Sequence, residues 1–178
     1  MKAQKPRHYS AIEQKAREHA KAFHMGGYRD PERASKHRAG LLKIVPEFRE
    51  TSLQRLAISH SLGRENLRLV SQSLKLIEKE HLETALGNDK MPQYSRNRIS
   101  GEVQKLLEGK TPDELRKISA AIDYEMREID AVVTAINSPE TGGSWTHYYI
   151  HSGSALHAMF NFLQANILEK ISQIRRQA

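Results

Sequence analysis

A long uncharged run near the C-terminal end constrains the fold more than any other feature. Residues Thr141 to Leu168 contain no Asp, Glu, Lys or Arg, although charged residues recur every few positions elsewhere in the 178-residue chain. The run becomes apolar only from Ala155 onward, and polar residues still interrupt it there, so it is too short and too polar for a membrane span. It predicts a buried helix, from about Ser154 to Arg176, at the centre of a bundle of other helices.

The residues before this helix differ in character. Gly142 to Gly153 is rich in Gly, Ser, Thr, His and Tyr and holds Trp145, the single Trp of the chain. We expect a loop that leads into the central helix, with Trp145 filling a gap in the core.

Further helices are predicted by apolar residues that recur every three or four positions, the spacing of one helical face. Asp30-Pro31 and Thr111-Pro112 are start signals, because each places a capping side chain before a proline at the first helical position. Pro46 is expected to end a helix. Gly63 marks either a kink or a turn. The expected helices are Tyr9–Met25, Pro31 to about Ile44, a segment from the Thr51–Gln54 capping box to Gly63, about Arg64–Leu86, Arg96–Glu108 after a loop at Asp89–Ser95, and Thr111 through Asn137.

Strand-like alternation is short and isolated, and one short strand is not stable alone. The predicted fold class is therefore all-α: a single-domain helical bundle of five to seven helices with the C-terminal helix central. Residues 1–7 are expected to form a flexible basic arm and residues 8–178 the bundle, within which residues 8–49 form a basic helical pair that acts as a subdomain.

The net positive charge of the chain comes entirely from its first quarter. The net charge is +7, and residues 1–49 hold twelve basic and five acidic residues, while the remaining sixteen of each sign balance. Such an asymmetry indicates an anionic partner, with a basic surface that serves only solubility as the alternative. The candidate anion-binding residues in this region are Lys15, Arg17, Lys21, Arg29, Arg33, Lys36, Arg38 and Lys43.

The segment from Leu56 to Leu74 resembles a helix-turn-helix, with Ala57 in the first helix and Gly63 in the turn. Gly63 follows Ala57 by six residues instead of the usual four, which lengthens the first helix by about half a turn. An ordinary αα-hairpin is the alternative interpretation. Polar residues of the second helix are candidates to reach bases or phosphates: Arg64, Asn66, Arg68, Ser71 and Gln72.

Three histidines are the candidates for chemistry. His147 and His151 share a face if their segment is helical, and His157 is close in sequence. The chain has no Cys, and this tract has no carboxylate to complete a ligand set or to act as a general base. A loop whose His and Tyr side chains hydrogen-bond helix ends is therefore favoured, and no catalytic residue, metal or cofactor is predicted.

The sequence thus favours a non-enzymatic helical protein that binds an anionic partner, nucleic acid before an anionic membrane surface, through its basic N-terminal helices. The first alternative is a protein-interaction bundle, such as a bacterial effector, adaptor or assembly subunit. The second is an enzyme or metal site at His147, His151 and His157. Because no apolar segment follows the basic residues Met1 to Arg7, we expect a cytoplasmic protein or one secreted without a cleaved signal peptide.

Overall fold

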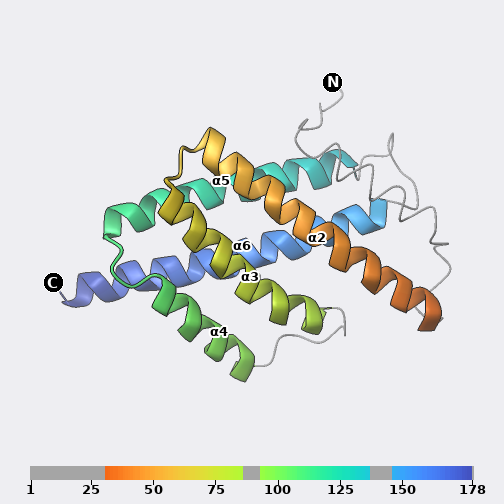
Figure 1. Ribbon diagram of the computed structural model, residues 1–178, viewed down its shortest axis with the longest axis horizontal. Coiled ribbons are helices and arrows are strands. Elements are labelled where there is room, and N and C mark those ends of the chain that lie inside the picture. The colour runs from red at the N-terminus through yellow and green to blue at the C-terminus, as the bar shows by residue number, and fades with distance from the viewer. Residues whose placement is uncertain (1–30, 86–92, 137–145, 178) are drawn as a thin grey trace. The chain divides into compact units, whose positions relative to one another are not determined.

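The computed structural model describes residues 31–85, 93–136 and 146–177. Every regular element in these ranges is a helix, so the predicted all-α class is confirmed (Figure 1). The expected helix at Tyr9–Met25, the basic arm and Trp145 lie outside the described residues. The described helices are α2 (Pro31–Ser59), α3 (Arg64–Ala85), α4 (Gln93–Leu106), α5 (Pro112–Ile136) and α6 (Thr146–Gln177).

The chain divides into two compact units. Unit 1 comprises Met1–Thr51 and Arg127–His157, and unit 2 comprises Ser52–Met126 and Ala158–Ala178. Helices α3 and α4 belong wholly to unit 2, whereas α2, α5 and α6 contribute residues to both units. The predicted subdomain at residues 8–49 stays a prediction, because residues 1–30 are not described.

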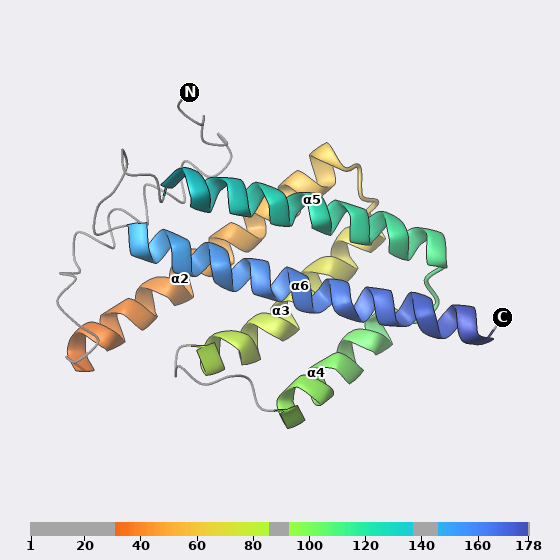
Figure 2. The same cartoon turned by 180° about the vertical axis from the view of Figure 1, so that it is seen from behind.

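Unit 2 has an apolar core to which each of its helices contributes, and α3 and α4 lie side by side in both views (Figures 1 and 2). The side chains of this core are almost completely buried, and the burial of apolar surface is the main favourable term in folding. Its buried members include Leu56 of α2, Leu74 and Ile77 of α3, Ile99 and Val103 of α4, Leu115, Ile118 and Ile122 of α5, and Phe160, Leu163 and Ile167 of α6.

Helix α6 is buried over most of its circumference, which agrees with the prediction that it packs on more than one side. Its exposed positions between residues 154 and 168 are Ser154, Asn161, Ala165 and Leu168. At 3.6 residues per turn these four fall within about 60° of one another, so only a narrow stripe faces solvent. Helix α5 contacts each of the other helices. None of the described helices has the length and apolar character needed to cross a bilayer.

The prediction that Pro46 ends a helix is wrong, because α2 runs through it from Pro31 to Ser59. Proline removes one backbone donor and crowds the preceding turn. Here the cost is offset by burial, since Ile44, Val45 and Phe48 are fully buried around it. The Thr51–Gln54 segment therefore lies inside a helix and is not a helix start.

Gly63 belongs to a true turn between α2 and α3, not to a kink. Ser61 has a φ of 49°, in the left-handed region that few residues other than glycine adopt. The Leu62 amide donates to the Leu56 carbonyl at 3.2 Å, which closes the end of α2. The Leu67 amide donates to the Gly63 carbonyl at 2.9 Å, which opens α3.

Two other predicted loops are partly helical. Helix α4 begins at Gln93, three residues before the expected start, and the Gln93 side chain donates to Asn97 Oδ1 at 2.8 Å. Helix α6 begins at Thr146, so the predicted loop up to Gly153 is wrong for its last eight residues. Gly153 is tolerated inside this helix because it allows a close approach to α5: a Cβ there would lie 2.5 Å from Val133 Cγ2.

Candidate nucleic-acid interface

The exposed side of α3 carries a row of basic residues. Val70, Leu74 and Ile77 turn the opposite side of the helix into the core of unit 2. The basic residues and one glutamine recur at intervals of three or four, so they fall within about 80° of one another around the helix. This cationic stripe consists of Arg64, Arg68, Gln72, Lys75 and Lys79, all of them exposed. At 1.5 Å per residue it is about 22 Å long.

The four cations of the stripe form no ion pair with any residue that the structure describes, because the nearby acids have other partners. Glu65 lies 3.8 Å from Lys110 Nζ, in the loop that follows α4. Glu80 pairs with Arg98 of α4, and Glu102 also pairs with Arg98 at 3.3 Å. The stripe therefore keeps a local positive excess although unit 2 contains many acids.

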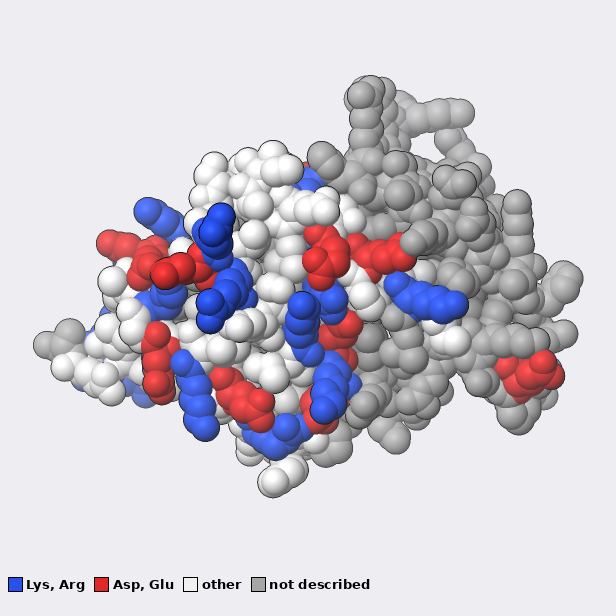
Figure 3. Space-filling view, in the orientation of Figure 1, with Lys and Arg blue, Asp and Glu red and all other residues white. Residues whose placement is uncertain are grey.

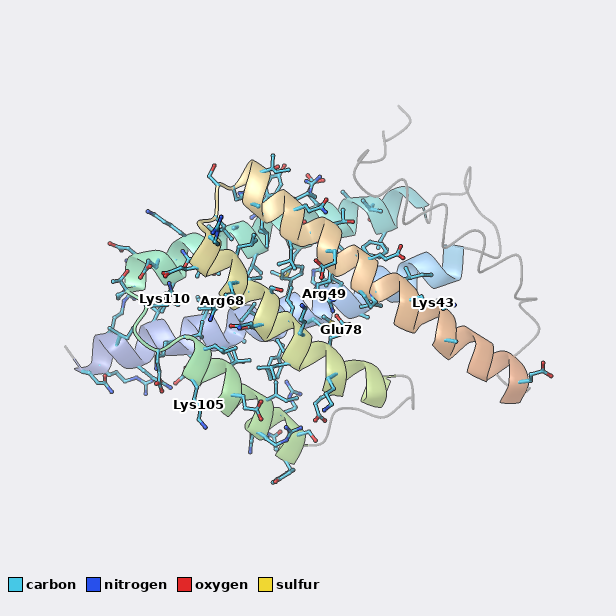
Figure 4. All side chains as sticks on the ribbon, in the orientation of Figure 1. Lys43, Arg49, Arg68, Glu78, Lys105 and Lys110 are labelled. Atoms are coloured by element: carbon cyan, nitrogen blue, oxygen red, sulfur yellow. The ribbon has the colours of Figure 1, made fainter. Side chains whose placement is uncertain are left out.

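Figures 3 and 4 show the charged side chains of α3 and α4. In Figure 3, blue and red side chains are mixed over α3 and α4, so the stripe lies on a surface that also carries acids. Figure 4 labels Arg68 on α3 and Lys105 on the neighbouring α4. Glu78, also labelled there, is half-buried and engages in an interaction of its own.

The structure places three of the predicted residues, Arg64, Arg68 and Gln72, on one face and adds two that sequence reasoning missed. Arg64 and Arg68 are exposed on one face, and Lys75 and Lys79 continue that face. The spacing of these four residues, at intervals of four, seven and four, was the signal that could have found them. Asn66 lies on the other side of α3 with its Oδ1 atom buried, so it is not part of this surface.

The predicted N-terminal surface is described at one residue only. Lys43, on α2 in unit 1, is exposed as expected. The rest of this set lies outside the described residues or has side chains that are not described, so its role stays a prediction: Lys15, Arg17, Lys21, Arg29, Arg33, Lys36 and Arg38.

The three candidate histidines lie on α6. His147 and His151 are one turn apart on a helical backbone, and their side chains are not described. His157 follows His151 by six residues, so it is rotated from it by about 120° and displaced by about 9 Å. Among the described side chains no group of three metal-ligating residues occurs.

His157 has a carboxylate partner that sequence reasoning missed. Its Nε2 atom lies 3.3 Å from Asp130 Oδ2, and both residues belong to unit 1. Asp130 comes from α5, which is distant in sequence from the histidines. A carboxylate of this kind can orient an imidazole.

The chain matches no known protein family, no curated protein and no solved structure.

Proposed function

We propose that the protein binds nucleic acid without sequence specificity, through the cationic stripe of α3 together with the basic residues of positions 1–49. The observation that carries the proposal is the row of four exposed cations with no acidic partner among the described residues. The excess charge of residues 1–49 supports it. Phosphate contacts need only charge and reach, and they provide most of the affinity of non-specific binding.

The stripe suits a phosphate backbone better than an isolated anion. Phosphates repeat about every 3.4 Å along each strand, so the stripe is as long as about six nucleotides of one strand. Arginine also presents a planar set of donors that matches two phosphate oxygens at once. No cavity that would hold a small anion is needed for such contacts.

A charge-matched pair of variants tests the proposal. Arg68→Gln/Lys75→Gln removes two charges from the stripe, while Arg116→Gln/Lys117→Gln removes two exposed charges from α5, where Arg116 pairs with Asp113 at 2.5 Å. Fluorescence anisotropy with labelled single-stranded DNA, duplex DNA and RNA at low and moderate salt measures the affinity of each protein. Anionic vesicles form a separate arm of the experiment.

We expect the wild-type protein to bind nucleic acid more weakly as salt rises, and the stripe variant to lose about ten-fold or more in affinity at low salt. The α5 variant should stay close to the wild type. Binding that is absent at low salt, stronger for vesicles than for any nucleic acid, or equally weakened by both variants would contradict the proposal.

The protein-interaction alternative has less support in the described residues. Ile58 and Leu168 are exposed by 78% and 54%. Single exposed apolar side chains are common on protein surfaces and do not by themselves indicate a partner.

A further inference from the structure

We infer that Tyr94 of α4 is a stacking platform for an unpaired base, so that the surface of α3 and α4 prefers single-stranded nucleic acid to duplex. This inference rests on the nucleic-acid binding proposed above. Tyr94 is 78% exposed, among the most exposed large side chains of the described residues. It forms no ring contact and no hydrogen bond with any of them.

The helix geometry turns Tyr94 outward. Ile99 and Val103 are the buried residues of α4. Val103 follows Tyr94 by nine residues, or two and a half turns, which places the two side chains on opposite sides of the helix. The tyrosine ring therefore points away from the core, as the cationic stripe does on α3.

The contacts between α3 and α4 place Tyr94 at one end of the stripe. Arg98 of α4 contacts Glu80 of α3, and Lys110, just beyond α4, contacts Glu65 at the start of α3. The two helices therefore run antiparallel. Glu80 is the residue after Lys79, and Tyr94 is one turn before Arg98, so Tyr94 lies on the helix next to the stripe, toward its Lys79 end.

Helix α4 is also held in a fixed position within unit 2. Its Ser100 hydroxyl donates to Asn166 Oδ1 of α6 at 2.5 Å, and the Gln104 amide donates to the Asn166 carbonyl at 2.8 Å. Asn166 is buried. These bonds lie on a side of α4 away from Tyr94, so they position the ring without covering it.

The chemistry of this arrangement favours a single strand. Surfaces that bind single strands combine cations that follow the backbone with aromatic rings on which bases stack. In a duplex the bases are already stacked on one another, so an exposed ring finds no free base face.

The test compares Tyr94→Leu, which removes the ring, with Tyr94→Phe, which keeps it. Tyr124→Leu is the matched control, because Tyr124 is the other markedly exposed tyrosine of the described residues and lies on α5. Each protein is titrated with a labelled oligo(dT) strand and with a labelled mixed-sequence duplex. Circular dichroism confirms that each variant keeps its helices.

We expect the wild type to prefer the single strand, and Tyr94→Leu to weaken oligo(dT) binding about five-fold or more with little change for the duplex. Tyr94→Phe and Tyr124→Leu should bind oligo(dT) as the wild type does. If Tyr94→Leu binds oligo(dT) as tightly as the wild type, or loses affinity equally for oligo(dT) and duplex, the inference is overturned. Binding of nucleic acid by the wild type would still support the proposed function in that case. A wild type that binds neither ligand overturns both.

Discussion

The Arg55 Nε atom lies 2.9 Å from Glu125 Oε1, and the two side chains are only 8% and 0% exposed. This ion pair joins α2 to α5 within unit 2. Removing two charges from water costs several kcal/mol each, so such a pair is stable only when both charges find partners. Arg55 and Glu125 each make further interactions as well. The pair therefore specifies which residue of α2 meets which residue of α5.

Glu125→Ala should lower the free energy of unfolding by about 3 kcal/mol or more, because it leaves a buried guanidinium without this carboxylate. Urea denaturation measures the loss. The double variant Arg55→Met/Glu125→Leu removes both charges and should recover most of the stability. A single variant as stable as the wild type would show that the pair contributes little.

Gly153→Ala should destabilise the protein by about 1–3 kcal/mol, because the added Cβ would overlap Val133 Cγ2. Gly101→Ala on α4 is the control: a Cβ at Gly101 has no atom within 4 Å, so alanine should stabilise α4 by up to about 1 kcal/mol. Thermal denaturation of both variants checks the opposite signs. Adding Val133→Ala to Gly153→Ala should restore stability, and two variants that shift in the same direction would contradict this account.

The start of α5 should contribute a pH-dependent part of the stability. The Thr111 amide donates to Glu114 Oε2 at 2.9 Å and the Thr111 hydroxyl at 3.1 Å; these bonds and the charge of Lys110 lower the pKa of Glu114 below its usual 4.5. Because the folded pKa is the lower one, this stabilisation is present above pH 4.5 and is lost as the pH falls through the folded pKa.

The variant Glu114→Gln keeps the capping geometry but not the charge. The difference in urea midpoint between wild type and variant should therefore shrink as the solution is acidified below pH 4.5. A difference that stays constant with pH would mean that the Glu114 charge does not act at this helix start.

The salt dependence of binding should report the number of phosphate contacts made by the stripe. Each contact contributes about 0.9 to the slope of log K against log salt for duplex DNA and about 0.7 for single strands. Arg68→Gln/Lys75→Gln should reduce the slope by about 1.8 and about 1.4 for these two ligands. Titrations over several salt concentrations measure it, with Arg116→Gln/Lys117→Gln as the reference. An unchanged slope would place the phosphate contacts elsewhere.

Local signals predicted helix boundaries well where the atoms that decide them are close in sequence. The start of α5 is an example: the Thr111 hydroxyl accepts from the Glu114 amide at 3.2 Å, and the two residues are three positions apart in the chain. Pro46 is the opposite case. Its place inside α2 depends on the burial of Ile44 and Phe48 by residues far away in sequence, which no local rule contains.

The candidate site shows the same division. Exposure of Arg64 and Arg68 followed from helical spacing alone. That the stripe is left without acidic partners depends on the pairing of Glu80 with Arg98, which follows from the register that folding gives to α3 and α4. Charge counts cannot reveal such a register, because they treat paired and unpaired residues alike.

The packing of α6 against α5 also bears on the order in which the protein is made. Gln164 of α6 donates to the Ser119 carbonyl of α5 at 3.4 Å, and Gly153 fits against Val133. The ribosome makes α6 after the other described helices, so the apolar side chains of α5 that α6 covers stay exposed until α6 emerges. Chains halted before α6 should therefore expose these apolar side chains to chaperones, and the core of unit 2 is completed only when α6 has been made.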